Sequence, residues 1–253
     1  MSDEEAACGV STHSSGNHAQ ALALAARLRG IPAYIVMPKN APEVKKAAVA
    51  GYGGKITFCE PTLDARESTL AQIVEATGSV AVHPYNDERV IAGQGTATLE
   101  LLEEVPDLDV IIAPVGGGGL LSGTATAATE IKTDIRVIAG EPEMADDAYR
   151  SLKTGEILPS VKPQTIADGL LTSLGNKTFP IIQTRVEQIV TVSEQGIIDS
   201  MKFIWERVKI IIEPSSAVAV GVLWERKIDL TGLKVGIILS GGNVDLQKLP
   251  WQT

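Results

Sequence analysis

Four consecutive glycines, Gly116 to Gly119, follow an apolar run that ends at Val115 and precede a helix-like stretch. Glycine lets successive backbone N–H groups turn toward one point, so this loop can bind a phosphate where a helix begins. A tight turn alone would not need four glycines. The loop has neither the G-x-x-x-x-G-K-[ST] pattern of Walker-type hydrolases nor the G-x-G-x-x-G spacing of dinucleotide folds. It therefore predicts a phosphate site of another kind.

A second polar loop runs from Thr12 to His18, between an apolar run and a helix-like stretch. Ser14 or Ser15 can cap that helix, and the N–H groups of its first turn can bind an anion. Gly16 permits a close approach of the backbone, and Asn17 can hydrogen-bond a hydroxyl or phenolate. A substrate carboxylate would suit this loop. An ordinary capped helix start explains the same residues about equally well.

The third loop, Ser240-Gly241-Gly242-Asn243, follows another apolar run. The Ser240 hydroxyl can pair with a neutral ring nitrogen without forcing that nitrogen to be protonated. Taken alone, this segment reads as a glycine-containing turn. Together the three loops offer a phosphate site, a partner for an aromatic nitrogen and a carboxylate clamp. One ligand that needs all three is an adduct of pyridoxal 5′-phosphate (PLP) with an amino acid.

The elements that must position these loops alternate along the chain. Short, β-branched apolar runs predict buried strands, and the amphipathic stretches between them predict helices, so we expect mostly parallel sheets covered by helices. Ligands on such sheets bind at the carboxyl ends of the strands. The expected strands are 8–12, 33–37, 55–59, 80–83, 110–115, 135–139, 188–192 and 235–239, and the expected helices are 18–28, 42–52, 64–77, 93–104, 120–131, 194–208 and 216–225.

Composition excludes several classes of protein. The 253 residues carry a net charge of −9, which argues against a nucleic-acid binder. Only Cys8 and Cys59 are present, so a disulfide framework is not expected, and the acidic start is unlike a signal peptide. No apolar run reaches the length of a membrane span. We therefore expect a cytoplasmic protein without a membrane partner.

Four motifs give the chain a specific resemblance: T-H-S-S-G-N-H-A-Q, P-V-G-G-G-G-L, T-I-A-D-G and L-S-G-G-N-V-D, in this order and spacing. They resemble serine racemases and the similar threonine (serine) ammonia-lyases, which are fold-type II PLP enzymes related to the tryptophan synthase β-subunit. The similarity runs from about Gly9 to Asp245. It implies two three-layer αβα domains, a small one over residues 9–80 with the substrate-carboxylate loop and a large PLP-binding one over residues 81–253. The large one is expected to be N-terminally truncated.

The resemblance also implies roles for individual residues. Ser15 matches the serine that racemases use as acid and base, and Gly169 matches a loop that closes over the cofactor. The substrate-binding positions are Ser14, Ser15, Gly16, Asn17 and His18, and the cofactor-binding positions are Asn17, Gly116, Gly117, Gly118, Gly119, Gly169 and Ser240.

Two further sites follow from the resemblance. Glu141, Asp147 and the Ala145 carbonyl match positions that bind Mg²⁺ or Ca²⁺, and hard oxygen ligands suit those cations. Without the resemblance, a solvated acidic loop would be the better interpretation. Three positions match contacts to an ATP effector in animal serine racemases, although an exposed helix face explains the lysine among them at least as well. They are Gln20, Lys45 and Tyr52.

One family feature is missing from these residues. The PLP-binding lysine of the family lies in an S-x-K-x-R-G-A segment that precedes the T-H-S-S-G-N-H loop, but the first lysine here is Lys39. That lysine attaches the cofactor and removes the substrate α-proton, so its loss should lower the rate by many orders of magnitude. A fragment or misassigned start, a short isoform and a repurposed binding protein are the competing explanations. The intact loops favour the first.

Two functions follow from the sequence. The first is PLP-dependent serine racemase or L-serine/L-threonine ammonia-lyase activity, which gives a 2-oxo acid and ammonia. The S-S-G-N-H motif disfavours a cysteine synthase, and the chain ends before the ACT-type regulatory domain of biosynthetic threonine deaminases would begin. The second is a catalytically inert PLP- or amino-acid-binding chain that acts with a full-length subunit. An enzyme of this family is expected to be a homodimer.

Overall fold

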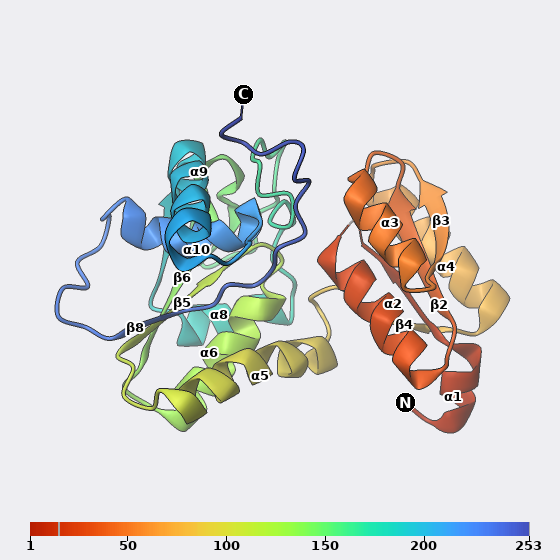
Figure 1. Ribbon diagram of the computed structural model, residues 1–253. Coiled ribbons are helices and arrows are strands. Elements are labelled where there is room, and N and C mark those ends of the chain that lie inside the picture. The colour runs from red at the N-terminus through yellow and green to blue at the C-terminus, as the bar shows by residue number, and fades with distance from the viewer. Residues whose placement is uncertain (15, 253) are drawn as a thin grey trace. The chain divides into compact units, whose positions relative to one another are not determined.

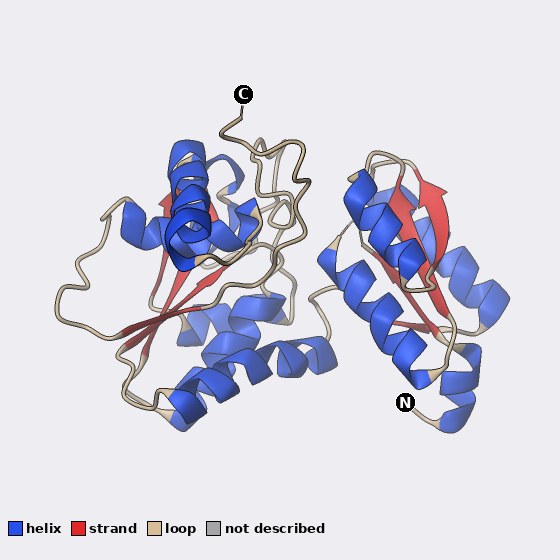
Figure 2. Ribbon diagram, viewed as in Figure 1, coloured by secondary structure: helices blue, strands red, loops and turns tan. Residues whose placement is uncertain are grey.

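The computed structural model describes residues 1–14 and 16–252. The chain divides into two units, an N-terminal unit, Met1–Pro84, and a C-terminal unit, Tyr85–Thr253. The division falls slightly after the boundary expected from the sequence, because the strand that begins at Val80 pairs with the first sheet. Figure 1 labels the elements of both units, and Figure 2 shows that helices flank the strands in each.

The sheet of the N-terminal unit has four parallel strands in the order β3-β2-β1-β4. Ile35 and Met37 face a buried cluster with the alanines of α2 and with Val49 of α3, while α4 contacts the sheet from the other side. The strands are β1 (Val10–His13), β2 (Ala33–Pro38), β3 (Lys55–Cys59) and β4 (Val80–Ala81), and the helices are α1 (Asp3–Cys8), α2 (Asn17–Arg29), α3 (Glu43–Gly51) and α4 (Leu63–Thr77).

The C-terminal unit also has four parallel strands, in the order β7-β6-β5-β8. Successive residues of its strands enter two different cores. The strands are β5 (Val110–Pro114), β6 (Arg136–Pro142), β7 (Gln188–Val192) and β8 (Val235–Ile237). The helices are α5 (Glu88–Glu104), α6 (Gly119–Ile131), the 3-10 turn η1 (Glu143–Ala145), α7 (Asp147–Thr154), α8 (Thr178–Arg185), α9 (Glu194–Phe203), the π-helical turn η2 (Ile204–Val208) and α10 (Pro214–Trp224).

Alternation along β5 explains how this sheet is covered. Ile111 and Ala113 pack with α5, α6 and α8, whereas Val110 and Ile112 pack with α9 and α10. Because neighbouring side chains of a strand point to opposite faces, an all-apolar strand can be buried on both sides. The predicted α/β class with two parallel-sheet units is confirmed.

Several expected element boundaries were wrong. Cys8 ends a helix instead of beginning a strand, because Ser2 and Glu5 form a capping box and the acidic first turn stabilises α1. Helix α5 begins at Glu88, before the expected Gly93, because the Asp87 carboxylate accepts a hydrogen bond from the Arg89 N–H. Helices α7 and α8 were not predicted at all. None of the described helices is long and apolar enough to cross a membrane.

Candidate active site

The four-glycine loop lies where β5 ends and α6 begins, as the sequence predicts. Gly118 has φ +90° and forms the N-cap of α6, a conformation that side chains rarely adopt. Among the described residues, the N–H groups of Gly116, Gly117 and Gly118 have no hydrogen-bond acceptor. Together with the first turn of α6, they leave a set of open donors at a helix N-terminus, which suits a phosphate.

Two residues that the sequence analysis did not single out shape this loop. A Cβ at Gly117 would collide with the Tyr85 ring. The buried Thr178 hydroxyl donates to the Gly117 carbonyl oxygen over 2.9 Å and accepts from the Gly175 N–H over 2.9 Å. Because the Gly117 carbonyl is engaged by Thr178, its peptide orientation is held. Neither residue belongs to a sequence pattern that could have identified it.

The other two positions of this unit that were predicted to bind the cofactor lie in loops. Gly169 lies in the segment between α7 and α8, and its N–H donates to the Ser215 hydroxyl. Ser240 follows β8, is exposed, and donates its N–H to the Ser216 hydroxyl. A Cβ at Gly116 would lie 2.9 Å from Leu170 Cα, so the Gly169 segment packs directly on the four-glycine loop.

The predicted carboxylate loop follows β1 and leads into α2. Gly16 is the N-cap of α2, so the predicted cap by Ser14 is wrong; the Ser14 hydroxyl instead accepts a hydrogen bond from the Gly16 N–H. Asn17 is the first residue of the helix, and His18 Nε2 donates to the Val82 carbonyl oxygen. Ser15 lies outside the described residues. The first turn of α2 offers N–H groups to an anion.

A cationic side chain lies close to this loop. Burial and the nearby Arg66 guanidinium lower the pKa of His13, which precedes Ser14 and contacts the His83 ring edge-on at 5.6 Å. Arg66 Nε is buried and has no hydrogen-bond partner among the described residues. The Arg66 charge acts on His13 at the end of β1, and the described residues include no ion-pair partner for Arg66. No sequence pattern marks Arg66, since a lone arginine in a helix gives no motif.

Lys45 is not part of an exposed helix face. The residue is 2% exposed, and its Nζ would lie 3.3 Å from a Cβ at Gly16. The expectation of a solvent-facing lysine was therefore wrong, because α3 turns this side chain toward the carboxylate loop. Gln20, on α2, is buried as well.

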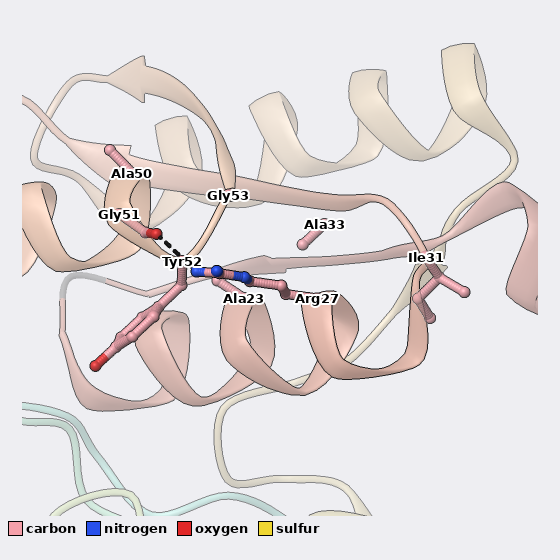
Figure 3. Close-up of a pocket in the computed structure, with 8 residues that line it drawn as sticks. All are labelled: Ala23, Arg27, Ile31, Ala33, Ala50, Gly51, Tyr52 and Gly53. Carbon is pink, nitrogen blue, oxygen red and sulfur yellow. Dashed lines mark hydrogen bonds between the residues drawn. The ribbon is translucent and has the colours of Figure 1, made fainter.

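Tyr52, the third predicted nucleotide contact, lines a surface cavity of about 420 Å³. Figure 3 shows Arg27 donating to the Gly51 carbonyl oxygen in this cavity, while the Tyr52 ring extends away from the guanidinium. Gln20 and Lys45 are not among its lining residues. The three positions therefore do not form one cavity. The lining residues are Ala23, Arg27, Ile31, Ala33, Ala50, Gly51, Tyr52 and Gly53.

The predicted metal positions are buried, so the solvated-loop interpretation is wrong. Glu141 lies in strand β6 rather than in a loop. Its two carboxylate oxygens accept hydrogen bonds from the N–H groups of Ala148 and Tyr149, at 2.7 Å each. Asp147 begins α7, and neither of its buried oxygens has a hydrogen-bond partner among the described residues. Burial raises the pKa of Glu141 to about 8 and that of Asp147 to about 6.

A cation would fit this cluster. Unpartnered buried carboxylate oxygens are unfavourable unless a positive charge compensates them, and oxygen ligands suit Mg²⁺ and Ca²⁺. Ala145, whose carbonyl is the third expected ligand, is also buried. Among residues 1–14 and 16–252, no three His, Cys, Asp or Glu side chains group closely enough to hold a metal. A cation at this site would be bound by the Glu141 and Asp147 carboxylates and the Ala145 carbonyl oxygen.

Residues 2–241 match the family model described as "Pyridoxal-phosphate dependent enzyme". The chain belongs to this family. The glycine loop at the α6 N-terminus is therefore in a PLP enzyme, and its open N–H groups fit the phosphate of that cofactor.

The proteins to which this PLP-dependent chain is similar include a dehydratase and serine racemases. It is 51% identical to the β-hydroxyaspartate dehydratase of Paracoccus denitrificans, over 99% of this chain and 80% of the relative. The crystal structure of the Dictyostelium discoideum serine racemase is 52% identical, with a TM-score of 0.91 over 97% of this chain and 80% of that one. The maize serine racemase structure gives a TM-score of 0.95 at 45% identity, over all of this chain and 78% of that one.

Replacing Thr178 with valine should weaken binding of pyridoxine 5′-phosphate, a probe that has the phosphate and ring of PLP but no reactive aldehyde. The change keeps the side-chain shape but leaves the Gly117 carbonyl without its donor. Loss of one such hydrogen bond predicts roughly tenfold weaker binding. Titration calorimetry measures this. Thr178→Ser keeps the hydroxyl, so an equal loss in that variant would contradict the assigned role.

Proposed function

We propose that this chain carries the substrate and cofactor machinery of a PLP-dependent racemase and dehydratase acting on small β-hydroxy amino acids, L-serine or L-threonine first. The open N–H groups of Gly116 to Gly118 beside α6 are the observation that carries the proposal. The names of the relatives support the substrate class. Elimination of the β-hydroxyl as water would give an enamine, and hydrolysis of that enamine by one water molecule would then give a 2-oxo acid and ammonia.

PLP, when bound, supplies an electron sink for the negative charge that remains after the substrate α-proton leaves. The glycine loop of the C-terminal unit would bind the phosphate of PLP, and the Ser240 hydroxyl would form a hydrogen bond with the ring nitrogen. In the N-terminal unit, the N–H groups at the start of α2 would bind the substrate carboxylate. Ser15 would hold or deliver a proton at Cα on one face.

The proton transfer on the other face needs a base, which the family's lysine provides. No residue of these 253 occupies an S-x-K-x-R-G-A context. Lys39 is not a substitute, because its hydrogen bond to Glu60 raises the pKa of its ammonium group, whereas a nucleophile must be neutral. The reaction is therefore expected to need a lysine from outside these residues.

An activity assay tests this proposal. A segment with the S-x-K-x-R-G-A pattern that the resemblance implies is joined ahead of Ser2, and release of 2-oxo acid and of D-serine from L-serine is measured. A matched chain carries alanine in place of the segment's lysine. We expect turnover only with the lysine. PLP binding without turnover in either chain would favour the inert binding protein instead.

A second substrate, 3-hydroxyaspartate, is favoured by Arg66. Its Nε is buried without a hydrogen-bond partner among the described residues, and its charge acts on the pKa values of His13 and Cys59. A second substrate carboxylate would neutralise that charge. A relative that is 51% identical is named for dehydration of β-hydroxyaspartate. Serine carries no second carboxylate. A variant of Arg66 should therefore affect binding of 3-hydroxyaspartate and not of serine.

Replacing Arg66 with glutamine should therefore change ligand preference. Binding of phosphopyridoxyl-L-aspartate, a stable cofactor–substrate conjugate, should weaken roughly 10- to 100-fold, as loss of a charged hydrogen bond predicts. Binding of phosphopyridoxyl-L-serine should change little. Arg29→Gln, on the exposed surface of α2, serves as the control. An equal loss for both conjugates would rule out a subsite for the second carboxylate.

Three finer features are part of the proposal. Mg²⁺ or Ca²⁺ would be held by Glu141, Asp147 and the Ala145 carbonyl, as the unpartnered Asp147 oxygens suggest. A homodimer is supported by the exposed apolar side chains of Val208, Ile210 and Ile211, and sedimentation velocity measures it. A cytoplasmic location agrees with two free cysteines.

An ATP effector has the least structural support. Gln20 and Lys45 are buried, and only Tyr52 lines a cavity, so these side chains would have to move to contact a nucleotide together. A shift of the unfolding temperature by MgATP, absent in Tyr52→Ala, measures this binding.

A further inference from the structure

Two adjacent serines begin helix α10. Pro214 occupies the first helical position, so Ser215 and Ser216 are the second and third residues of the first turn. They are 3% and 0% exposed. A serine side chain in the first turn often caps its own helix or faces solvent. Here both hydroxyls instead accept hydrogen bonds from backbone N–H groups that are remote in the sequence.

The two hydroxyls hold two different loops. Ser215 Oγ accepts from the Gly169 N–H at 2.9 Å, and Ser216 Oγ accepts from the Ser240 N–H at 3.0 Å. Both loops were assigned to the cofactor on sequence grounds, one closing over it and one presenting a hydroxyl to its ring nitrogen. One turn of one helix therefore fixes the spacing between them.

The Gly169 loop in turn supports the phosphate loop. A Cβ at Gly116 would lie 3.3 Å from the Gly169 carbonyl oxygen and 2.9 Å from Leu170 Cα. Gly116 has no side chain to separate the two segments, so a displacement of the Gly169 peptide would be transmitted to the first N–H group of the phosphate loop. Ser215 thus acts on the phosphate site through one intervening segment.

Helix α10 is a rigid base for these contacts. Its residues from Ala217 to Val222 are buried, and it packs on β5 and β6, the strands that lead into the glycine loop and the metal cluster. A hydrogen bond from the Glu213 N–H to the Gly241 carbonyl oxygen also connects the helix to the Ser240 loop. The helix is therefore anchored independently of the serine hydroxyls.

We propose that Ser215 and Ser216 are positioning residues of the PLP site, which hold the Gly169 and Ser240 loops at a fixed spacing from one helix turn. The inference rests on the proposed function, because both loops act on the cofactor only if PLP binds in the C-terminal unit. Neither serine touches the cofactor in this account. Each acts through a backbone N–H group of a loop.

The test compares Ser215→Ala and Ser216→Ala with two controls. Ser200→Ala removes a hydroxyl that is fully buried in α9 and has no hydrogen-bond partner among the described residues. Ser215→Thr keeps a hydroxyl acceptor. Hydrogen–deuterium exchange of the ligand-free chain and calorimetric titration with pyridoxine 5′-phosphate are measured for each variant.

We expect faster amide exchange around Gly169 in Ser215→Ala and around Ser240 in Ser216→Ala, each confined to its own loop. Affinity for pyridoxine 5′-phosphate should fall roughly three- to tenfold in each, the range for one lost internal hydrogen bond. Ser200→Ala and Ser215→Thr should match the wild type. A general loss of protection across α10 would indicate a purely structural role and overturn the proposal.

Unchanged affinity in both alanine variants, with faster exchange in the loops, would also overturn it. If the wild-type chain fails to bind pyridoxine 5′-phosphate at all, the proposed function fails and the inference falls with it. The exchange data distinguish the two failures, because they report the loop contacts without any ligand.

Discussion

Replacing Gly117 with alanine should lower the affinity for pyridoxine 5′-phosphate by about a hundredfold or more. The added methyl group would collide with the Tyr85 ring, so the loop or the ring has to move. A phosphate in this loop would be bound by several charge-assisted hydrogen bonds from backbone N–H groups, and a shifted peptide loses more than one of them. Titration calorimetry at fixed salt measures the change.

Gly93→Ala is the matched control for this variant. Gly93 lies within α5 with no heavy atom near its absent Cβ, so alanine should leave phosphate binding unchanged and stabilise the helix by about 0.5–1 kcal/mol. Adding Tyr85→Ala to Gly117→Ala removes the obstacle and should restore part of the affinity. Equal binding by Gly117→Ala and Gly93→Ala would show that the glycine loop does not bind the phosphate.

The second large effect concerns Glu141 and Asp147, the two buried carboxylates proposed to bind a cation. Their pKa values, about 8 for Glu141 and about 6 for Asp147, lie above the ordinary values because of burial. Between the unfolded and folded pKa values, the folded chain binds more protons than the unfolded chain, so the free energy of unfolding falls as pH rises. Without a divalent cation, we expect a loss on the order of a few kcal/mol between pH 4 and 8.

Calcium should reverse this loss, because a bound cation favours the ionised carboxylates. The rise in unfolding temperature on adding Ca²⁺ should thus be large at pH 8 and small at pH 5. Asp147→Asn should abolish the Ca²⁺ effect and, without Ca²⁺, should be more stable than the wild type at pH 8. Glu143→Gln, an exposed neighbour, should behave as the wild type. A Ca²⁺ effect that persists in Asp147→Asn would place the cation elsewhere.

The sequence predicted those parts of the fold in which local pattern and burial agree. The run at Gln188–Val192 is a strand with the expected bounds and is mostly buried, because its β-branched apolar residues fit a pleated, buried backbone. The glycine loop was placed correctly for a similar reason, since few structures other than a loop at a helix N-terminus need four glycines. These signals are local, and tertiary contacts reinforce them.

Other features depend on contacts that no local pattern encodes. Lys45 is a lysine on a short amphipathic helix, which predicts exposure, but tertiary packing buries it beside Gly16. Helix α7 was missed because its N–H groups are satisfied by Glu141, a carboxylate from the preceding strand, rather than by a neighbouring cap residue. Thr178, Ser215 and Ser216 act on loops far away in the sequence, so only the structure identifies them.

The central claim is that the C-terminal unit binds the phosphate and ring of PLP with its glycine loop and Ser240. A crystal structure of the chain with phosphopyridoxyl-L-serine tests it most directly, since this conjugate needs no lysine for attachment. We expect the phosphate on the N–H groups of Gly116 to Gly119 and the ring nitrogen at the Ser240 hydroxyl. The claim would be contradicted if crystals grown with saturating conjugate showed no phosphate in contact with those N–H groups.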